Sequence, residues 1–204
     1  MTKYLFDTKE NDPQEYYWFK TALSKQEVGK VIALASELPE GERAAVIGDE
    51  GGGNTRTSMV KWIPRESPDW DWLYEKMMDL ATEANAELWN FDLKTALEAI
   101  QYTEYYASEK GHYDWHQDIG PGELPSKRKV SITIQLSDDN EYKGGELQIC
   151  TGSDGDGLFS HTRTCERGAG VGVLFPSYMM HRVSPVTNGT RKSLVLWVGG
   201  EHYR

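Results

Sequence analysis

Cysteine and long apolar runs are scarce in this sequence. Its two cysteines, Cys150 and Cys165, are too few for a disulfide framework and lack the spacing of a zinc site. No apolar stretch approaches the length of a membrane span. The N-terminal segment MTKYLFDTKENDPQEYYWF has no basic start followed by an apolar core, so no signal peptide is expected. These absences predict a protein of the reducing cytoplasm without a membrane partner.

Positive charge is scarce as well. The chain has 22 lysines and arginines against 32 aspartates and glutamates, which gives a net charge of -10. Nucleic acids and anionic membranes attract basic surfaces, so neither is expected as the main partner, whereas a basic peptide stays compatible. Hydrophobic residues make up 38% and charged residues 26%, a balance typical of a folded domain.

The first half of the chain carries the signals of two helices. A short strand is expected in EYYWFKTALS, and SKQEVGKVIALASEL follows it, with Ser24 as N-cap and Glu27 completing a capping box. Pro39 would end this helix. Its apolar positions share one helical face: Val28, Val31, Ile32, Ala35 and Leu38.

A second helix is predicted over SPDWDWLYEKMMDLATEANAELW, with Ser67 as a possible cap and Pro68 at the first helical position. Between the helices, GDEGGGNTR (48–56) has the composition of a loop, and RTSMVKWIP is typical of a strand that ends at Pro64. The expected buried stripe of the second helix is Trp72, Met77, Leu80, Ala84 and Leu88.

From about Leu97 the pattern changes to β. Turn residues such as Asn188-Gly189 separate short β-branched or aromatic runs, namely LEAIQYTEYYA, KVSITIQLS, GGELQIC, GVGVLF, MMHRVSPV and RKSLVLWVGG. Such strands after two helices predict a mainly β fold with flanking helices, either a β-sandwich or a jelly roll. TGSDGDGLF (151–159) is expected to be a hairpin loop, because it lacks the ligand spacing of a calcium loop.

A candidate site emerges from WHQDI and MMHRV. Strand alternation would direct His116 and Asp118 to the same side. His181 lies in an apolar strand, and Arg191 follows just past the Asn188-Gly189 turn, so these two are expected on adjacent strands of one hairpin. Two histidines and a carboxylate on one face would bind a metal and leave open positions. An arginine could neutralise the far carboxylate of a dicarboxylic ligand. A polar strand end without a metal is the alternative.

Three segments carry a resemblance to a known family. They are YYASEKGHYDWHQD, KVSITIQLSDDNEYKGGELQI and GVGVLFPSYMMHRVSPVTNGTRKSLVLW, which together cover about residues 97–198. The order of H-x-D, a GGEL strand, an FP turn, a distal histidine and an arginine ten residues later resembles the Fe(II)/2-oxoglutarate dioxygenases, in particular their prolyl 4-hydroxylase-like branch.

The resemblance implies one domain over residues 1–204, with helical support over about 21–96 and a metal-binding β core over about 97–200. The fold would be a double-stranded β-helix, that is, a cupin-like jelly roll. The resemblance further implies Fe(II) as the metal, 2-oxoglutarate and O2 as cosubstrates, and ascorbate as a supporting reductant. The implied iron ligands are His116, Asp118 and His181, with Arg191 on the distal carboxylate of 2-oxoglutarate.

The resemblance also implies further pocket residues. Tyr106, ten residues before His116, would contact 2-oxoglutarate, and Tyr113 would form the pocket wall. Ser131, Thr133 and Gln135 would share one strand face, with Thr133 and Gln135 near the cosubstrate. Four further polar residues are expected to have no role in the site, namely His112, Asp114, His161 and His202. Trp115 is expected only to pack.

The expected reaction is hydroxylation of an unactivated C–H bond, in a prolyl or similar residue of a peptide or protein. An aspartate at position 118, where related halogenases have a small residue, favours hydroxylation. The loops at 48–56 and 119–127 are expected to shape substrate access. Two alternatives stay open, a hydroxylase of a free amino acid or other small molecule and a non-catalytic cupin-like protein that binds a metal or ligand.

Overall fold

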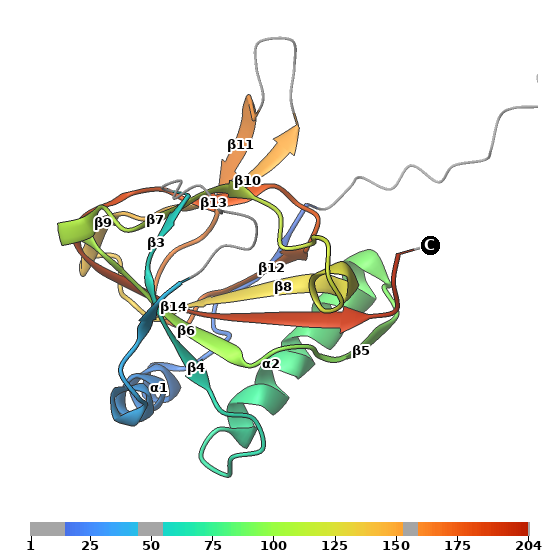
Figure 1. The fold of residues 1–204 in the computed structure, drawn as a ribbon, viewed down its shortest axis with the longest axis horizontal. Helices are drawn as coiled ribbons and strands as arrows, with labels where there is room; N and C mark the ends of the chain where they lie inside the picture. Colours follow the sequence, from blue (N-terminus) through green and yellow to red (C-terminus); the bar gives the residue numbers. More distant parts are fainter. Residues whose placement is uncertain (1–14, 45–54, 153–158, 204) are drawn as a thin grey trace, which may run out of the picture.

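The computed structural model describes residues 15–44, 55–152 and 159–203 (Figure 1). Its helices are α1 (Lys25–Glu37) and α2 (Asp71–Ala84), with the short helical turns η1 (Asn85–Trp89), η2 (Ala107–Glu109) and η3 (Pro125–Lys127). The strands are β1 (Tyr17–Phe19), β2 (Glu42–Arg43), β3 (Arg56–Thr57), β4 (Met59–Ile63), β5 (Leu93–Ala96), β6 (Ile100–Tyr106), β7 (His112–His116), β8 (Arg128–Gln135), β9 (Tyr142–Gly144), β10 (Leu147–Gly152), β11 (His161–Thr164), β12 (Gly172–Pro176), β13 (His181–Val183) and β14 (Val186–Gly200).

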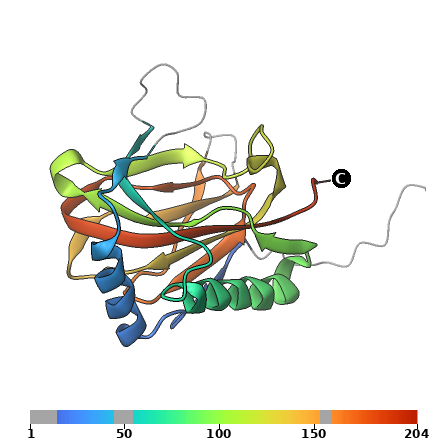
Figure 2. The ribbon, with the colours of Figure 1, turned by 60° about the horizontal axis from the view of Figure 1, so that its bottom comes forward.

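The strands form two antiparallel sheets. In the large sheet the order is β1-β12-β8-β14-β6-β4-β2, and β5 and β9 also pair with β14. In the small sheet the order is β11-β10-β13-β7-β3. Figures 1 and 2 show both helices along one side of the large sheet, while the small sheet lies on its other side. The prediction of a mainly β fold with flanking helices is confirmed.

Helix α1 forms as its sequence predicts. The Ser24 hydroxyl accepts a hydrogen bond from the Glu27 N–H at 3.3 Å, and the Glu27 carboxylate accepts one from the Ser24 N–H at 2.7 Å. This capping box satisfies backbone donors that the first turn leaves free. Val28, Val31 and Ala35 are buried against the large sheet.

Helix α2 begins later than the sequence predicts. Its N-cap is Trp70 and no side chain caps it; the Ser67 carbonyl, and not its hydroxyl, accepts bonds from the N–H groups of Trp70 and Asp71. Pro68 therefore lies in a turn that precedes the helix. The fully buried face is also rotated relative to the predicted stripe, since it consists of Leu73, Met77, Ala81 and Ala84. Of the other predicted positions, Trp72 and Leu80 are partly buried and pack against the core.

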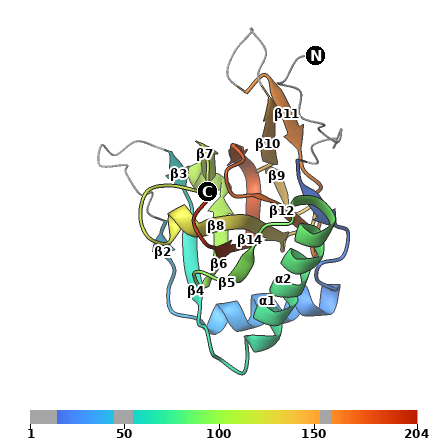
Figure 3. The same ribbon diagram turned by 90° about the vertical axis from the view of Figure 1, so that its right-hand side faces the viewer.

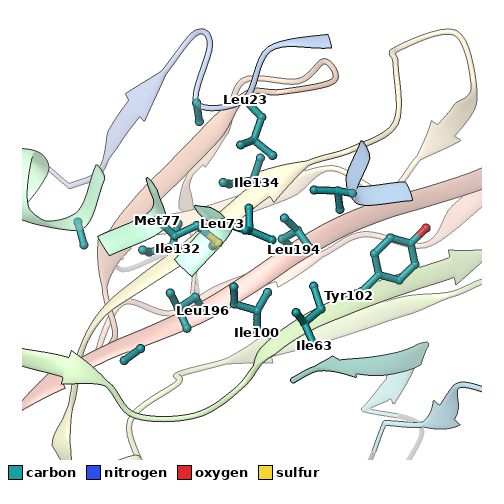
Figure 4. Close-up of a cluster of buried hydrophobic side chains, with 14 of the residues drawn as sticks. Leu23, Ile63, Leu73, Met77, Ile100, Tyr102, Ile132, Ile134, Leu194 and Leu196 are labelled. Atoms are coloured by element: carbon teal, nitrogen blue, oxygen red, sulfur yellow. The ribbon is translucent and has the colours of Figure 1, made fainter. Parts of the chain in front are cut away.

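The main hydrophobic core lies between the helices and the large sheet. Figure 4 shows Leu73 and Met77 of α2 against Ile132 of β8 and Leu196 of β14. These four side chains are completely buried. Each buried aliphatic side chain of this size contributes about 1.5–3 kcal/mol relative to its exposed state, so this layer fixes the large sheet as a rigid base.

Alternation along the strands then decides what lies between the sheets. In β14, Leu194 and Leu196 belong to the core under the helices, so Arg191, Ser193, Val195 and Trp197 point to the opposite side. That inner side holds a second apolar cluster: Tyr105, Tyr142, Leu147, Ile149, Cys165, Val171, Val173, Phe175, Val183 and Val186. Both sheets contribute polar side chains to the space between them, among them His116 and His181 from the small sheet and Arg191 from the large one.

The turn predicted at Asn188-Gly189 does not form. Asn188-Gly189 is not a hairpin turn, because β14 runs unbroken from Val186 to Gly200 and pairs there with β9. The chain instead leaves the small sheet after β13 and enters the large sheet at Val186. His181 and Arg191 therefore approach the same space from opposite sheets.

The strand predicted in RTSMVKWIP is divided in the same manner. It changes sheets at Ser58, because β3 pairs with β7 in the small sheet and β4 pairs with β6 in the large one. β10 and β11 pair as the predicted hairpin and extend away from the helices (Figure 3). Most of its loop, like most of the loop predicted at 48–56, lies outside the described residues.

No helix in the described ranges combines the length and apolarity needed to cross a bilayer.

Candidate functional site

Two histidines face each other across the small sheet. His116 at the end of β7 and His181 at the start of β13 are direct partners in the antiparallel register, and their ring centroids are 4.1 Å apart. Asp118 joins them from the loop after β7. The ligand-type atoms of these three residues all lie within 4.8 Å of one another.

The reason given for the approach of Asp118 was wrong, although the approach itself occurs. Strand β7 ends at His116, so Asp118 does not share a strand face with it. The chain bends after His116, and the Asp118 N–H donates to the Ser177 carbonyl at 2.9 Å. Its carboxylate oxygens lie 3.7 Å from His116 Nε2 and 3.5 Å from His181 Nε2.

Backbone carbonyls fix the tautomer of both imidazoles. His116 Nδ1 lies 2.7 Å from the Asp114 carbonyl oxygen, and His181 Nδ1 lies 2.9 Å from that of Met179. A carbonyl only accepts hydrogen bonds, so each Nδ1 carries the proton and each Nε2 keeps its lone pair. Both lone pairs are on the side of the Asp118 carboxylate, as a metal site requires.

Burial and nearby charges set the protonation states of His116 and Asp118. Burial, with repulsion from His181, lowers the pKa of His116 to about 3, so its imidazole is neutral at pH 7. Burial alone would raise the pKa of Asp118, but attraction to the two histidines and the hydrogen bond from Ser131 outweigh it and lower that pKa. A neutral imidazole and an ionised carboxylate are the forms that bind metals.

The donor set can therefore hold a divalent metal ion. Two imidazole nitrogens and one carboxylate on one side leave further coordination positions open, the arrangement typical of non-haem Fe(II) sites. Clusters of acidic residues on a surface are common without a metal. In this cluster, by contrast, Asp118 and His181 are buried and the His116 side chain is only 12% exposed.

Arg191 lies in the same cavity with most of its hydrogen-bonding capacity unused. Its side chain is 1% exposed, and only Nη1 has a partner, the Ser193 hydroxyl at 3.1 Å. Among the described residues, Nε and Nη2 are buried without any hydrogen-bond partner. The guanidinium lies over the ring of Tyr105, 5.2 Å from its centroid. A buried, permanently charged fork with free donors has the chemistry to bind a carboxylate.

The cavity that joins these groups has a volume of about 40 Å³, against roughly 10–15 Å³ for one water molecule. Both sheets line it: Arg56, Gln101, Tyr105, Tyr113, His116, Asp118, Thr133, Leu147, His181, Val183, Arg191, Ser193, Val195 and Trp197. The ligand-type atoms of His116, Asp118 and His181 thus share one cavity with the Arg191 guanidinium.

The structure brings Tyr113 and Thr133 into this cavity, but not Tyr106. Tyr106 is on the helix side of β6, where its hydroxyl donates to the Glu104 carboxylate at 2.7 Å. Strand alternation is the reason, because the adjacent Tyr105 takes the inner side. Gln135 is buried on the inner side of β8 with its Oε1 unpartnered, but it is not among the lining residues.

Several lining residues were not predicted. Tyr105, Ser193 and Trp197 could have been found by counting every second residue on β6 and β14. Arg56 could not, because β3 reaches the cavity only through its long-range pairing with β7. Its guanidinium is half-buried over the Tyr113 ring at 4.7 Å and donates to Gln101 Oε1 at 3.3 Å.

The other candidates lie outside the cavity. His112 Nδ1 bonds to the Lys110 carbonyl, and Trp115 stacks on Phe159 with ring centroids 4.7 Å apart. His161 is exposed on β11, and His202 is exposed after β14. That these residues take no part in the site stays a prediction.

The β core also matches a known family. The model of the 2OG-Fe(II) oxygenase superfamily matches residues 100–199, about half of the chain. The chain belongs to this superfamily. Membership implies Fe(II), 2-oxoglutarate and O2, and it confirms the family predicted from the motifs.

The curated relatives of this oxygenase match it over about half of the chain. A PKHD-type hydroxylase from Synechococcus sp. (strain CC9605) is 33% identical over 109 residues, which are 53% of this chain and 45% of that protein. The chain thus spans less than half the length of the curated relatives it matches.

Two solved structures resemble the oxygenase over nearly the whole chain. A Pseudomonas putida prolyl-4-hydroxylase has a TM-score of 0.66 at 20% identity and covers 92% of this chain and 93% of its own. A prolyl hydroxylase from Trichoplax adhaerens, in complex with a hypoxia inducible factor peptide fragment, has a TM-score of 0.69 at 17% identity, with 91% and 83% covered. At these identities the likeness shows the fold, and it confirms the predicted double-stranded β-helix.

Proposed function

We propose that the protein is an Fe(II)- and 2-oxoglutarate-dependent dioxygenase that hydroxylates an unactivated C–H bond in a prolyl or similar residue of a peptide or protein. The observation that carries the proposal is the buried guanidinium of Arg191, whose Nε and Nη2 have no partner, in the cavity of the His116, Asp118 and His181 cluster. A buried arginine without an anion is costly, so the cavity is suited to an acid bound beside a metal.

Each residue has a specific role in this proposal. His116 and His181 would bind Fe(II) through Nε2, and Asp118 would bind it through its carboxylate. Arg191 would hold the distal carboxylate of 2-oxoglutarate, with Thr133 in contact and with Tyr105 in the position predicted for Tyr106. The bound metal and 2-oxoglutarate supply the activation of O2.

The chain's own side chains protect this chemistry. Leu147, Val183 and Val195 give the cavity apolar walls, which limit the access of water and strengthen the electrostatic attraction between Arg191 and a bound acid. Burial raises the pKa of Tyr113 to about 12, so its hydroxyl stays protonated and can donate a hydrogen bond to substrate.

Three features support a peptide or protein substrate. The cavity of about 40 Å³ is partly open to solvent, so one side chain of a longer chain could reach the metal from outside. The related Trichoplax adhaerens enzyme was solved with a peptide fragment. The net charge of -10 suits a cationic segment around that residue.

Because both cysteines are free thiols, we place the activity in the cytoplasm.

The balanced reaction makes the proposal testable. One 2-oxoglutarate, one O2 and one C–H bond give succinate, CO2 and C–OH, with one oxygen atom entering each organic product. The enzyme is supplied with Fe(II), ascorbate and 2-oxoglutarate in air, with and without a library of proline-containing peptides. Succinate equimolar with a mass gain of one oxygen in a peptide is the expected result, and His116→Ala should remove both.

The same assay separates the alternatives. Turnover with free amino acids but with no peptide would replace the proposed substrate class by small molecules. Metal binding without succinate under any condition would leave a non-catalytic binding protein.

A further inference from the structure

Asp118 is held differently from the two histidines of the cluster. It lies beyond the end of β7, so no strand pairing fixes it. Its N–H and that of Ile119 both donate to the Ser177 carbonyl, at 2.9 and 3.1 Å, and its own carbonyl accepts from Arg128 Nη1 at 2.9 Å. These contacts fix the backbone but leave the carboxylate free to rotate, because the terminal torsion of an aspartate is broad.

Two buried hydroxyls act on the carboxylate. Ser131 Oγ lies 2.6 Å from Asp118 Oδ2, and Ser177 Oγ lies 3.0 Å from Ser131 Oγ. Ser131 is 1% exposed and Ser177 is completely buried. Neither residue belongs to the apolar cores. Their hydroxyls meet because β8, which carries Ser131, lies beside the turn after β12, which carries Ser177.

The direction of the two bonds follows from hydrogen-bond chemistry. An ionised carboxylate only accepts, so Ser131 must donate its single hydroxyl proton to Asp118 Oδ2. Having no second proton, Ser131 must then accept from Ser177. The bonds therefore run in one order, from the Ser177 hydroxyl to Ser131 and from Ser131 to Asp118.

We propose that Ser131, supported by Ser177, is a positioning residue that locks the carboxylate of Asp118 in its metal-binding orientation. The inference rests on the proposed metal site and adds two residues to it. Ser131 polarises and orients the ligand without touching the metal, and Ser177 keeps the Ser131 hydroxyl from turning away. Partners of this kind change metal affinity by roughly 10–100-fold when removed.

A purely structural role predicts a different outcome. Any buried hydroxyl that loses its partner lowers stability, but only a positioning residue also lowers metal affinity. Ser137 is a matched control, since it is 3% exposed and its Oγ bonds to the Thr190 carbonyl and the Lys192 N–H at 3.1 and 2.9 Å. Ser137→Ala removes a comparable buried hydroxyl just beyond the end of β8, without touching Asp118.

The experiment measures the affinity of the full chain for Co(II) by calorimetric titration. Ser131→Ala should weaken it roughly 10–100-fold, Ser177→Ala should weaken it less, and Ser137→Ala should leave it unchanged. Because Ser177 acts only through Ser131, the double variant Ser131→Ala/Ser177→Ala should bind no more weakly than Ser131→Ala alone. Circular dichroism verifies that each variant is folded.

Two results would overturn the inference. One is an affinity of Ser131→Ala equal to that of Ser137→Ala; if Ser131→Ala does not fold, the same comparison is made with Ser177→Ala. The other is an additive loss in the double variant. Failure of the proposed function looks different. Either no succinate is formed although Co(II) binds, or the wild-type protein binds Co(II) no more tightly than His116→Ala does.

Discussion

Gly145 lies directly against the aliphatic part of Arg191. A Cβ atom at Gly145 would be 3.1 Å from Arg191 Cδ, 3.1 Å from Tyr142 Cε2 and 3.0 Å from Val186 Cγ2. These distances are shorter than ordinary carbon–carbon contacts of about 3.5–4.0 Å. The course of Arg191 into the cavity therefore depends on the missing side chain at position 145.

Gly145→Ala should displace the guanidinium and weaken 2-oxoglutarate binding. A misplacement of about 1 Å can cost a rate factor of roughly 100, so we expect the KM for 2-oxoglutarate to rise about tenfold or more with Co(II) affinity unchanged. The φ of +64° at Gly145 adds backbone strain. Gly168→Ala is the control, because its φ is +112° and the nearest atom, Val171 Cγ2, is 3.7 Å away. Equal KM values for the two variants would contradict the argument.

Arg191→Met should have opposite effects on stability and on binding. Methionine fills a similar volume and removes a buried charge whose Nε and Nη2 have no hydrogen-bond partner among the described residues, so the protein without ligands should melt at a higher temperature than the wild type. Loss of the charged pair should cost 2-oxoglutarate about 2–5 kcal/mol of binding free energy, which is roughly 30-fold or more in affinity. Calorimetry with Co(II) present measures the binding. A variant that melts lower and still binds 2-oxoglutarate would place the acid elsewhere.

Tyr113 stacks flat on the imidazole of His116, with ring centroids 3.4 Å apart and planes 13° apart. Aromatic pairs contribute about 0.5–1.5 kcal/mol beyond their buried area. Tyr113→Leu should therefore weaken Co(II) binding roughly two- to tenfold, whereas Tyr113→Phe should retain it. The comparison separates the ring from the hydroxyl. If Tyr113→Phe loses as much affinity as Tyr113→Leu, the stacking is not what orients His116.

Local sequence signals predicted the elements that depend on local interactions. The capping box of Ser24 and Glu27 located α1 correctly, and alternating apolar residues located the strands of the β core. The motif order predicted that His116, Asp118 and His181 would meet. None of these predictions required knowledge of which strands pair.

The errors came from tertiary structure. Asn188-Gly189 has the composition of a turn, but pairing with β9 holds it inside β14. Tyr106 has the expected spacing from His116, yet alternation on β6 directs Tyr105 to the cavity. Ser177 and Arg56 gave no signal, because they reach the site from turns and edge strands whose position depends on the assembled sheets.

The two helices are joined by an ion pair that should make stability depend on pH. Lys76 of α2 donates to the Glu27 carboxylate of α1 at 2.5 Å. This bond, with the N–H of Ser24 and against the effect of burial, lowers the pKa of Glu27 from 4.5 to about 2. Because the unfolded state then binds more protons than the folded state, stability falls as the pH drops through this interval. The contribution is complete above about pH 4.5 and is lost towards pH 2.

Glu27→Gln isolates this contribution, since glutamine can keep the capping box while the charge is removed. Between pH 6 and 7 the variant should lose about 0.2–1 kcal/mol of unfolding free energy, and the difference from the wild type should shrink steadily as the pH falls towards 2. Urea unfolding at several pH values measures it. Glu37→Gln, at the exposed end of the same helix, should show no such loss. A difference that stays constant down to pH 2 would mean that Glu27 stabilises the helices by packing, because only a group that gains its proton in this interval can lose its contribution there.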